Sequence, residues 1–376
     1  MTNQSGNAMK ILWLTWKDRS HPRAGGAEIV NEELAKRLVQ NSHEVTFLTS
    51  LFEGAAPQEK REGFSIIRMG NRFTVYWKAY RYYKKHLTEW PDLVVDEMNT
   101  IPFFAKFYVK QKNIMFVHQL CREIWFYQMP LPLSLIGYIL EPLYLWLLND
   151  TKVVTISQSS KRDLMRLGFK AEKIHIISEG IEMEAAKDLV AIKKFSDPTI
   201  LALGAIRPMK RTHSIVKAFE HVKSTLPNAR LILAGLAEGS YGERVVARAK
   251  RSTYAADIEY LGRIDEAKKL ELLQKAHVLC ATSVKEGWGL VVTEAASQGT
   301  PAAVYDVDGL RDSVKDGETG VVSKKNMPAS LAESIVGLLK DEKGYAEMRR
   351  GGWEWSKEIN FDTSYNQFLE VVKKYV

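Results

Sequence analysis

The sequence predicts an α/β protein made of two doubly wound, Rossmann-like domains, each built on a parallel sheet. Short apolar runs alternate with segments of helical periodicity over 10–156, and the same alternation restarts over 199–305. Between the two series, the stretch 177–198 breaks the pattern with charged and turn-forming residues. Two such series indicate two domains, which a chain of 376 residues is long enough to form.

The first series opens with a βαβ unit. A buried strand is expected at Lys10–Trp16, a helix at Ala27–Gln40, and a second strand at Glu44–Thr49. Because strands of a parallel sheet are buried on both faces, further strands are expected wherever a short apolar run occurs. These runs are Leu93–Asp96, Asn113–Val117 and Lys152–Ile156.

The second series repeats this arrangement. Its expected strands are Thr199–Gly204, Ala229–Gly235, Ile258–Leu261, His277–Ala281 and Thr300–Tyr305, with helices such as His213–Thr225 and Glu266–Lys275 in the gaps. The chain ends in one more expected helix, Thr363–Val376, which follows a break at Glu358–Asp362.

Composition narrows the function classes. The net charge is +8, and residues 1–180 carry +6 of it, which predicts an anionic surface or substrate on that side. The two cysteines, Cys121 and Cys280, lack CxxC spacing and so predict neither a disulfide framework nor a cysteine-based zinc site. A reducing compartment and the lack of a recognisable secretory signal predict a cytoplasmic location. No metal-ligand cluster is recognisable, so no metal or other cofactor is expected.

The strongest chemical signal is a glycine-bearing turn between two carboxylates, Glu286-Gly287-Trp288-Gly289-Leu290-Val291-Val292-Thr293-Glu294. The free N–H groups of Gly289, Leu290 and Val291 would bind an anion at the positive end of the expected helix. Helical rise would place the two carboxylates about 12 Å apart, which is wider than the ~5–9.5 Å of glycosidase pairs. The pair therefore suits holding two parts of one ligand, with solvated glutamates beside a glycine loop as the alternative.

A second signal follows the strand expected at Thr199–Gly204. Arg207 and Lys210 lie in the segment Gly204-Ala205-Ile206-Arg207-Pro208-Met209-Lys210-Arg211. Cations beside a strand end can neutralise a diphosphate and stabilise the charge that grows on a departing phosphate. The alternative is a solvated basic turn.

Three weaker signals follow other expected strands. Gly25-Gly26 begins the first helix and favours a phosphate or sugar, although it is also an ordinary turn and is not the GxGxxG fingerprint of dinucleotide binding. His118 directly follows a strand, where ligands of parallel sheets bind, although a structural histidine is the alternative. Ile264 lies in Gly262-Arg263-Ile264, after another strand.

Together these segments resemble the retaining glycosyltransferases of family 4, which have the GT-B fold of two Rossmann-like domains facing a central cleft. The resemblance spans nearly the whole chain and is densest over Ile200–Val322. It implies that Glu286 contacts hydroxyls of the donor sugar and that Glu294 binds the ribose of the nucleotide. It also implies that 1–180, with a crossover helix at 357–376, form the acceptor-side domain and that 181–356 bind the nucleotide-sugar donor.

The same resemblance implies further roles. Lys210 matches the phosphate-binding lysine, His118 lies near the transferred sugar, and Ile264 belongs to the loop that contacts the nucleobase. Gly25 and Gly26 match a first-domain loop that reaches the cleft. The sequence departs from the family pattern at Ala205, where arginine is usual, and at Arg211, where glycine is usual, so Arg207 is the candidate replacement for the arginine.

Two segments of the first half suggest contact with an anionic membrane. Phe73–Leu87 places aromatic residues at helical spacing with basic residues largely elsewhere, which suits either a membrane interface or a helix packed on its aromatic face. Leu131–Leu148 could line a groove for a lipid acceptor, but Pro142 favours a pair of core helices split at that residue.

The predicted function is retaining transfer of a hexose-type sugar from a nucleotide diphosphate donor to a lipid-linked or glycan acceptor, as in polysaccharide biosynthesis. Catalytic roles are predicted for His118, Arg207, Lys210 and Glu286, and donor binding for Gly25, Gly26, Ile264, Gly289, Leu290, Val291 and Glu294. A GT-B sugar-nucleotide epimerase and a non-catalytic sugar-nucleotide or membrane-binding protein are the alternatives. No nucleic-acid partner is expected, because no RNA- or DNA-binding motif is present.

Overall fold

The computed structural model describes residues 8–375, which its contacts divide into two compact units. The first unit comprises the residues up to 122, 132–180 and those from 361 onward. The second comprises 123–131 and 181–360. Val376, the last residue of the predicted final helix, lies outside the described residues.

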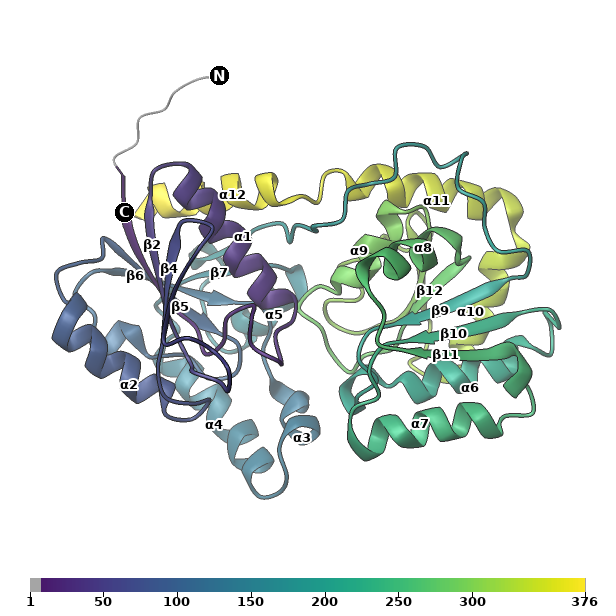
Figure 1. Ribbon diagram of the computed structural model, residues 1–376, viewed down its shortest axis with the longest axis horizontal. Coiled ribbons are helices and arrows are strands. Elements are labelled where there is room, and N and C mark those ends of the chain that lie inside the picture. The colour runs from purple at the N-terminus through teal and green to yellow at the C-terminus, as the bar shows by residue number, and fades with distance from the viewer. Residues whose placement is uncertain (1–7, 376) are drawn as a thin grey trace. The chain divides into compact units, whose positions relative to one another are not determined.

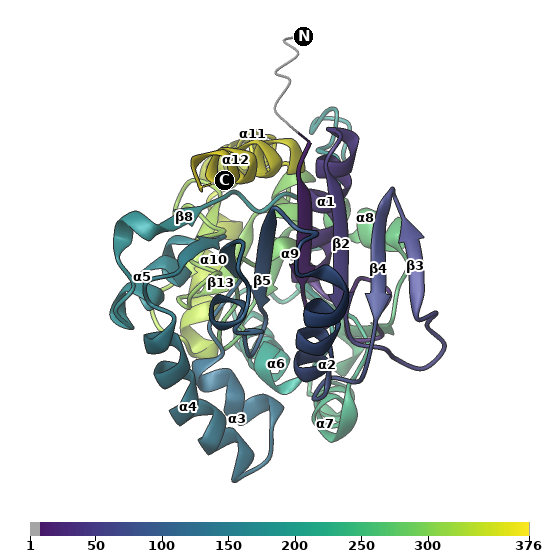
Figure 2. The same cartoon turned by 90° about the vertical axis from the view of Figure 1, so that its left-hand side faces the viewer.

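The first unit is built on an eight-stranded sheet in the order β3-β4-β2-β1-β5-β6-β7-β8. All neighbouring strands are parallel except β3 and β4, which form an antiparallel hairpin at one edge (Figure 2). The strands are β1 (Lys10–Leu14), β2 (Glu44–Thr49), β3 (Gln58–Arg61), β4 (Phe64–Arg68), β5 (Leu93–Met98), β6 (Lys112–Val117), β7 (Lys152–Thr155) and β8 (Ile174–Ile176).

Helices cover both faces of this sheet because successive residues of its strands point to opposite sides. On one face α1 (Gly26–Gln40) packs against α12 (Phe361–Tyr375), and the Trp13 ring lies 5.7 Å from that of Phe368. On the other face Leu12 and Leu14 pack against α2 (Val75–Tyr82), which continues as one π-helical turn, η1 (Tyr83–Leu87). The helices α4 (Leu133–Leu147) and α5 (Gln158–Arg166) contribute Leu145 and Leu164 to a neighbouring core cluster.

The predicted pair of core helices split at Pro142 is wrong. The segment forms the single helix α4, with Pro142 inside it. Proline lacks the N–H that would bond the carbonyl oxygen of Tyr138, four residues earlier. Arg122 Nη1 donates to that oxygen instead, at 3.2 Å, so the helix continues through the proline.

The second unit has a six-stranded, all-parallel sheet in the order β11-β10-β9-β12-β13-β14. When these six strands are numbered 1 to 6 along the chain, their order in the sheet is 3-2-1-4-5-6, which is the arrangement of dinucleotide-binding α/β domains. The strands are β9 (Thr199–Leu203), β10 (Arg230–Ala234), β11 (Ile258–Gly262), β12 (Val278–Ala281), β13 (Ala302–Tyr305) and β14 (Gly320–Ser323).

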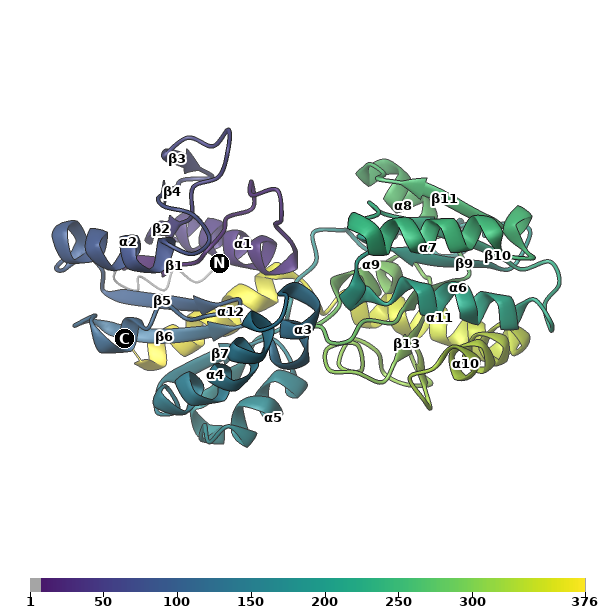
Figure 3. The same ribbon diagram turned by 90° about the horizontal axis from the view of Figure 1, so that it is seen from below.

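Helices again form a layer on each face of this sheet. Figure 1 shows α6 (Thr212–Val222) and α7 (Gly239–Arg251) on one side, and α8 (Glu266–Lys275), α9 (Leu290–Ser297) and α11 (Glu342–Ser356) on the other. The helix α10 (Pro328–Lys340) packs on α6, and Figure 3 shows α6 and α7 in front of the strands. The two α/β units with parallel sheets confirm the predicted fold class.

Candidate active site

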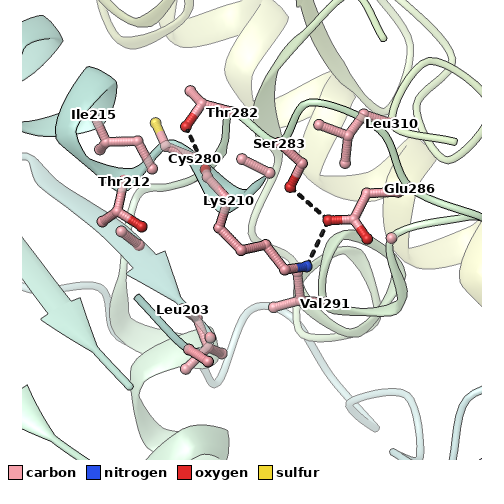
Figure 4. A pocket seen from close by; sticks show the side chains of 15 residues that line it. Leu203, Lys210, Thr212, Ile215, Cys280, Thr282, Ser283, Glu286, Val291 and Leu310 are labelled. Atoms are coloured by element: carbon pink, nitrogen blue, oxygen red, sulfur yellow. Dashed lines mark hydrogen bonds and ion pairs between the residues drawn. The ribbon is translucent and has the colours of Figure 1, made fainter. Parts of the chain in front are cut away.

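A pocket opens at the carboxyl ends of β9 and β12, the two central strands of the second unit (Figure 4). It is lined by Gly204 and Ala205 after β9, by Thr282 and Ser283 after β12, and by Lys210 from the 3₁₀ turn η5 (Pro208–Lys210). Between β9 and β12 the strand order reverses direction, and doubly wound sheets bind their ligands at this switch point. The topology alone therefore marks this pocket as the candidate ligand site.

Lys210 and Glu286 meet in this pocket. Lys210 Nζ lies 2.5 Å from Glu286 Oε1, and Ser283 Oγ donates to the same oxygen (Figure 4). Burial would raise the pKa of Glu286, but the charge and hydrogen bond of Lys210, the hydrogen bond of Ser283 and the charge of Arg207 together lower it. Glu286 is therefore an ionised acceptor at neutral pH, next to an ammonium group able to bind a phosphate.

Hydrogen bonds fix the turn that carries Lys210. Thr282 Oγ1 lies 3.1 Å from the carbonyl oxygens of both Lys210 and Arg211, and the N–H of Val284 donates to Met209 O at 2.8 Å. Arg211 has a φ of 49°, in the left-handed region that costs residues other than glycine ~1–2 kcal/mol. Position 211, where the resembled family usually has glycine, thus requires the backbone shape that glycine adopts most easily.

Arg207 places a second cation near Glu286. It directly precedes η5, and its Nε is buried without a hydrogen-bond partner in the described part of the chain. A buried N–H donor without a partner destabilises a protein, unless a ligand accepts its hydrogen bond. Arg207 Nε is therefore a candidate donor to a bound anion.

The start of α9 contributes backbone donors to the same pocket. Gly289 is the N-cap, with a φ of 102°, and a Cβ at this position would lie 3.0 Å from Leu310 Cδ2. Because glycine has no side chain, Gly289 cannot accept side-chain capping hydrogen bonds from the N–H groups of Leu290 and Val291. Val291 and Gly289 both line the pocket, where these amides suit an anion.

The loop after β13 contacts the backbone of Glu286 and holds it in position. The N–H of Glu286 donates to Asp308 O at 3.0 Å, and Lys285 pairs with the Asp308 carboxylate at 3.0 Å. Gly309 has a φ of 81°, and a Cβ there would lie 2.3 Å from Glu286 O. Only glycine lets the two loops approach this closely. The spacing of residues 286 and 309 along the chain does not indicate that they are neighbours.

Glu294 lies further along α9 and is already paired. Lys269 Nζ on α8 lies 2.8 Å from Glu294 Oε1. Burial raises the pKa of Glu294, and attraction to Lys269 offsets part of that shift. Lys269 was not predicted as a site residue, because a lysine on an amphipathic helix looks like a solvated charge. Ile264, half-buried between β11 and α8, packs against the core of this unit.

His118 lies in the first unit, within a buried polar cluster at the carboxyl ends of β1, β5 and β6. Its Nε2 is 3.2 Å from Asn31 Oδ1 and 3.8 Å from Glu97 Oε1. Burial, helped by the charge of Lys17, lowers the pKa of His118 to about 3, so the imidazole is neutral. Because Asn31 Oδ1 only accepts, Nε2 carries the hydrogen, and the buried Nδ1 has no partner in residues 8–375. His118 can therefore accept a hydrogen bond but is not a general acid.

Gly25 and Gly26 begin α1 in the same unit. The N–H of Gly25 donates to Glu28 Oε2 at 2.6 Å, and Glu28 also pairs with Lys17 Nζ at 3.0 Å. The Gly25 amide is thus engaged by the helix's own first turn, as in a capping box.

The second unit therefore assembles most of the predicted residues. Lys210, Glu286, Gly289 and Val291 line one pocket. Leu290 lies between the last two on α9, and the charge of Arg207 acts on Glu286. Glu294 lies farther along α9, and Ile264 precedes α8. Cations, helix amides and an acidic acceptor at a switch point suit a ligand that carries phosphate and hydroxyl groups. In residues 8–375 no group of three or more His, Cys, Asp or Glu is placed to hold a metal ion.

Sequence comparison assigns the family. Residues 188–355 match the family model described as Glycosyl transferases group 1, and residues 24–185 match Glycosyltransferase Family 4. The chain belongs to these glycosyltransferases, as predicted, and has their GT-B fold of two Rossmann-like domains.

Individual relatives differ in what they act on. The chain is 30% identical to the phosphatidyl-myo-inositol mannosyltransferase of Mycobacterium leprae over 175 residues, 46% of each chain. It is 22% identical to the N-acetyl-alpha-D-glucosaminyl L-malate synthase of Bacillus anthracis over 387 aligned positions, which cover 94% of this chain and 93% of the synthase. The chain spans about half the length of the first curated relatives that it matches.

Solved structures share the fold. The chain is similar to Anabaena HepE in complex with UDP and glucose, with a TM-score of 0.71 and 17% identity, over 97% of this chain and 100% of HepE. In the part of the chain that the structure describes, every helix is too short or too polar to span a bilayer.

Proposed function

We propose that this protein is a retaining glycosyltransferase, which moves a hexose-type sugar from a nucleotide diphosphate donor to a lipid-linked or glycan acceptor. The observation that carries the proposal is the meeting of Lys210, Arg207, Glu286 and the start of α9 at the switch point of the second sheet. Family membership and the likeness to HepE, whose solved complex holds UDP and glucose, support it.

Cleaving the donor leaves a nucleoside diphosphate, whose charge grows as the sugar departs. Lys210 and Arg207 would stabilise that charge, together with the amides of Leu290 and Val291 at the positive end of α9. Before the donor binds, Lys210 is held by Glu286. Binding would exchange one of the acceptors of Lys210 for a phosphate oxygen, which leaves a Glu286 oxygen free to accept from a sugar hydroxyl. No metal is required for this arrangement, because the cations and amides supply the positive charge.

The remaining predicted roles follow the same chemistry. Glu294 would accept from the ribose hydroxyls and Ile264 would lie near the nucleobase. His118, a neutral acceptor through Nδ1, would bind a sugar hydroxyl. Gly26, with Gly25, would bring backbone to the donor. We do not assign His118 as a base, because a lowered pKa makes it a poor proton acceptor.

The acceptor side of the proposal rests on charge and on relatives. The first 180 residues carry the basic excess, which suits an acceptor or membrane with anionic groups at the cytoplasmic face. The name of one relative specifies a phosphatidyl-inositol, a lipid, whereas that of another specifies malate, so the relatives support no single acceptor.

The test is a donor screen followed by one substitution. Purified protein is offered UDP-, GDP- and ADP-sugars, and thermal stabilisation and slow donor hydrolysis are measured. One nucleotide class should stabilise the protein, and Glu286→Gln should lower turnover at least tenfold, a loss of about 1.4 kcal/mol of transition-state stabilisation. The control is Glu318→Gln, an exposed glutamate of the same unit, which should leave turnover unchanged.

Three results would count against the proposal. Unchanged turnover in Glu286→Gln would reject the role of that carboxylate. Isomerised nucleotide sugar formed without any acceptor would identify an epimerase instead. Donor binding without turnover, whichever acceptor is offered, would indicate a non-catalytic binding protein.

A further inference from the structure

The helix α4 has its large apolar side chains on the wrong side for a helix in a water-soluble unit. Its buried positions include Ser134, Gly137 and Glu141, which are small or polar. Its outward positions are all aliphatic or aromatic, with 45% to 64% of each side chain exposed: Leu133, Leu135, Ile136, Ile139, Leu140, Leu143, Trp146 and Leu147. A surface helix normally turns its apolar stripe to the core. The orientation of α4 therefore indicates that its exposed face contacts an apolar medium.

Hydrogen bonds on the inward face of α4 fix the orientation of the helix. The two carboxylate oxygens of Glu141 accept from the N–H groups of Cys121 and Arg122, at 2.7 Å and 2.6 Å. Arg122 also bonds the carbonyl of Tyr138 that Pro142 leaves open. These contacts hold the helix rotated with Glu141 inward and the leucines outward.

The length and charge of α4 suit a helix that lies in a membrane surface. Fifteen residues span about 22 Å, less than the ~30 Å thickness of the hydrocarbon core. Between Glu123 and Asp150 the sequence has one charged residue, Glu141, and that residue is fully buried. The outward face therefore presents no charge to an apolar medium. Figure 2 shows α4 running along the lower left edge of the first unit.

A basic surface borders this apolar face. Residues 71–88 include five Lys or Arg and no Asp or Glu, and all five are exposed: Arg72, Lys78, Arg81, Lys84 and Lys85. Two large apolar side chains of the same segment, Phe73 and Trp77, are 66% and 62% exposed. Exposed apolar groups beside exposed basic groups are the composition of surfaces that bind anionic lipid.

The segment 103–108 connects the basic surface to α4. The ring of Tyr80 on α2 lies 5.0 Å from that of Tyr108, and the ring of Phe104 lies 6.0 Å from that of Tyr144 on α4. Lys106 Nζ donates to Leu147 O at the end of α4, and its neighbour Phe107 is 57% exposed. The segment 103–108 thus contacts both α2 and α4 within the first unit.

We propose that α4 lies flat in the interfacial region of an anionic lipid bilayer, with its leucine and isoleucine side chains among the acyl chains and the basic residues of 71–88 at the headgroups. A second copy of this chain is a poorer occupant. Self-association would bring two such basic surfaces together, and like charges facing one another across an interface destabilise it. This role makes α4 the membrane-binding element of the proposed membrane contact, and it does not depend on the transfer chemistry.

The test is flotation of the full-length protein with vesicles of phosphatidylcholine and phosphatidylglycerol. We compare the wild type with Ile139→Glu/Leu143→Glu, which places two charges in the apolar face. The matched control is Met165→Glu, because Met165 is an exposed apolar residue of α5 in the same unit. The wild type and the control should float with the vesicles, and the double variant should lose at least tenfold in partition coefficient.

A second readout does not depend on the double variant folding. Brominated lipid should quench part of the tryptophan fluorescence of the wild type, and Trp146→Phe should remove a large share of the quenched part. Flotation of the double variant at the wild-type level would overturn the proposal, as would equal quenching in Trp146→Phe. A wild type that dimerises in solution, stays off vesicles and becomes monomeric in the double variant would assign the face to a second copy.

The failure of this inference is distinguishable from that of the proposed function. Thermal stabilisation by the soluble donor is measured on the same variants without vesicles. Loss of flotation with unchanged donor stabilisation supports the membrane role of α4, whereas flotation without any donor response would contradict only the transferase proposal.

Discussion

Gly309 and Gly317 offer a matched test of how the site is supported. Both have left-handed backbones, with φ of 81° and 79°. A Cβ at Gly317 meets nothing within 4 Å, whereas a Cβ at Gly309 would lie 2.3 Å from Glu286 O and 2.5 Å from Glu286 C. Alanine at either position pays the same local conformational penalty, so the difference between the variants measures the contact with Glu286.

The magnitudes follow from these geometries. Gly317→Ala should lose about 1 kcal/mol, the cost of alanine in the left-handed region, and so lower Tm by ~2–4 °C for a unit of this size. Gly309→Ala should lose a further ~1–3 kcal/mol, because the clashing atoms are backbone and must move. That movement displaces the carboxylate from Lys210, so donor turnover should fall at least tenfold in Gly309→Ala and remain unchanged in Gly317→Ala.

The assay is thermal unfolding of both variants followed by turnover of the donor identified in the screen. Turnover is measured well below both unfolding temperatures, so that loss of fold does not contribute. Equal Tm values and equal turnover in the two variants would refute the claim that Gly309 sets the position of Glu286.

Three further predictions follow from other sites. Burial, followed by the negative charge of Glu28, raises the pKa of Glu97 from 4.5 to about 8. The folded state therefore holds a proton that the unfolded state releases, and stability should fall by about 3–4 kcal/mol as pH rises from about 5 to 8. Glu97→Gln should flatten this dependence in Tm-versus-pH curves, and an unchanged slope would contradict it. Arg211→Val should lower stability by about 2 kcal/mol, because a β-branched residue fits φ of 49° poorly, whereas Arg211→Gly should not; equal Tm losses would contradict this. Lys78→Glu/Arg81→Glu should weaken flotation with anionic vesicles by about tenfold and leave any binding to neutral vesicles unchanged, and an equal effect on both would remove the role of charge.

The alternation of apolar runs and helical segments was sufficient to predict the central strands of both sheets. Strands such as Glu44–Thr49 are buried on both faces, so their apolar character shows in the sequence. Of the four edge strands of the two described sheets, Ile258–Gly262 was predicted, at Ile258–Leu261, and the other three were not. Gln58–Arg61 is polar and half-exposed, and Gly320–Ser323 has only four residues, so neither has a periodic signal.

The segment around α4 shows a different limit. Its sequence is apolar throughout, which a core helix and a lipid-facing helix share. Only the contacts of Glu141 with Cys121 and Arg122 reveal which side faces inward. Pro142 argued for a break, and the side chain of Arg122 removes the reason for one.

Within the site, local motifs were readable and partners across the fold were not. Lys210, Glu286 and Gly289 occur in short segments whose residue types suggest phosphate and sugar chemistry. The closeness of Gly309 to Glu286 and of Lys269 to Glu294 depends on how two loops and two helices fold together. Nothing in the spacing of these residues along the chain encodes it.

A crystal structure of the protein with the nucleoside diphosphate of its preferred donor tests the central claim most directly. A phosphate oxygen should lie within hydrogen-bond distance of Lys210 Nζ and of the N–H groups of Leu290 or Val291, at the carboxyl ends of β9 and β12. A diphosphate bound at any other place, with the Lys210–Glu286 pair undisturbed, would contradict it.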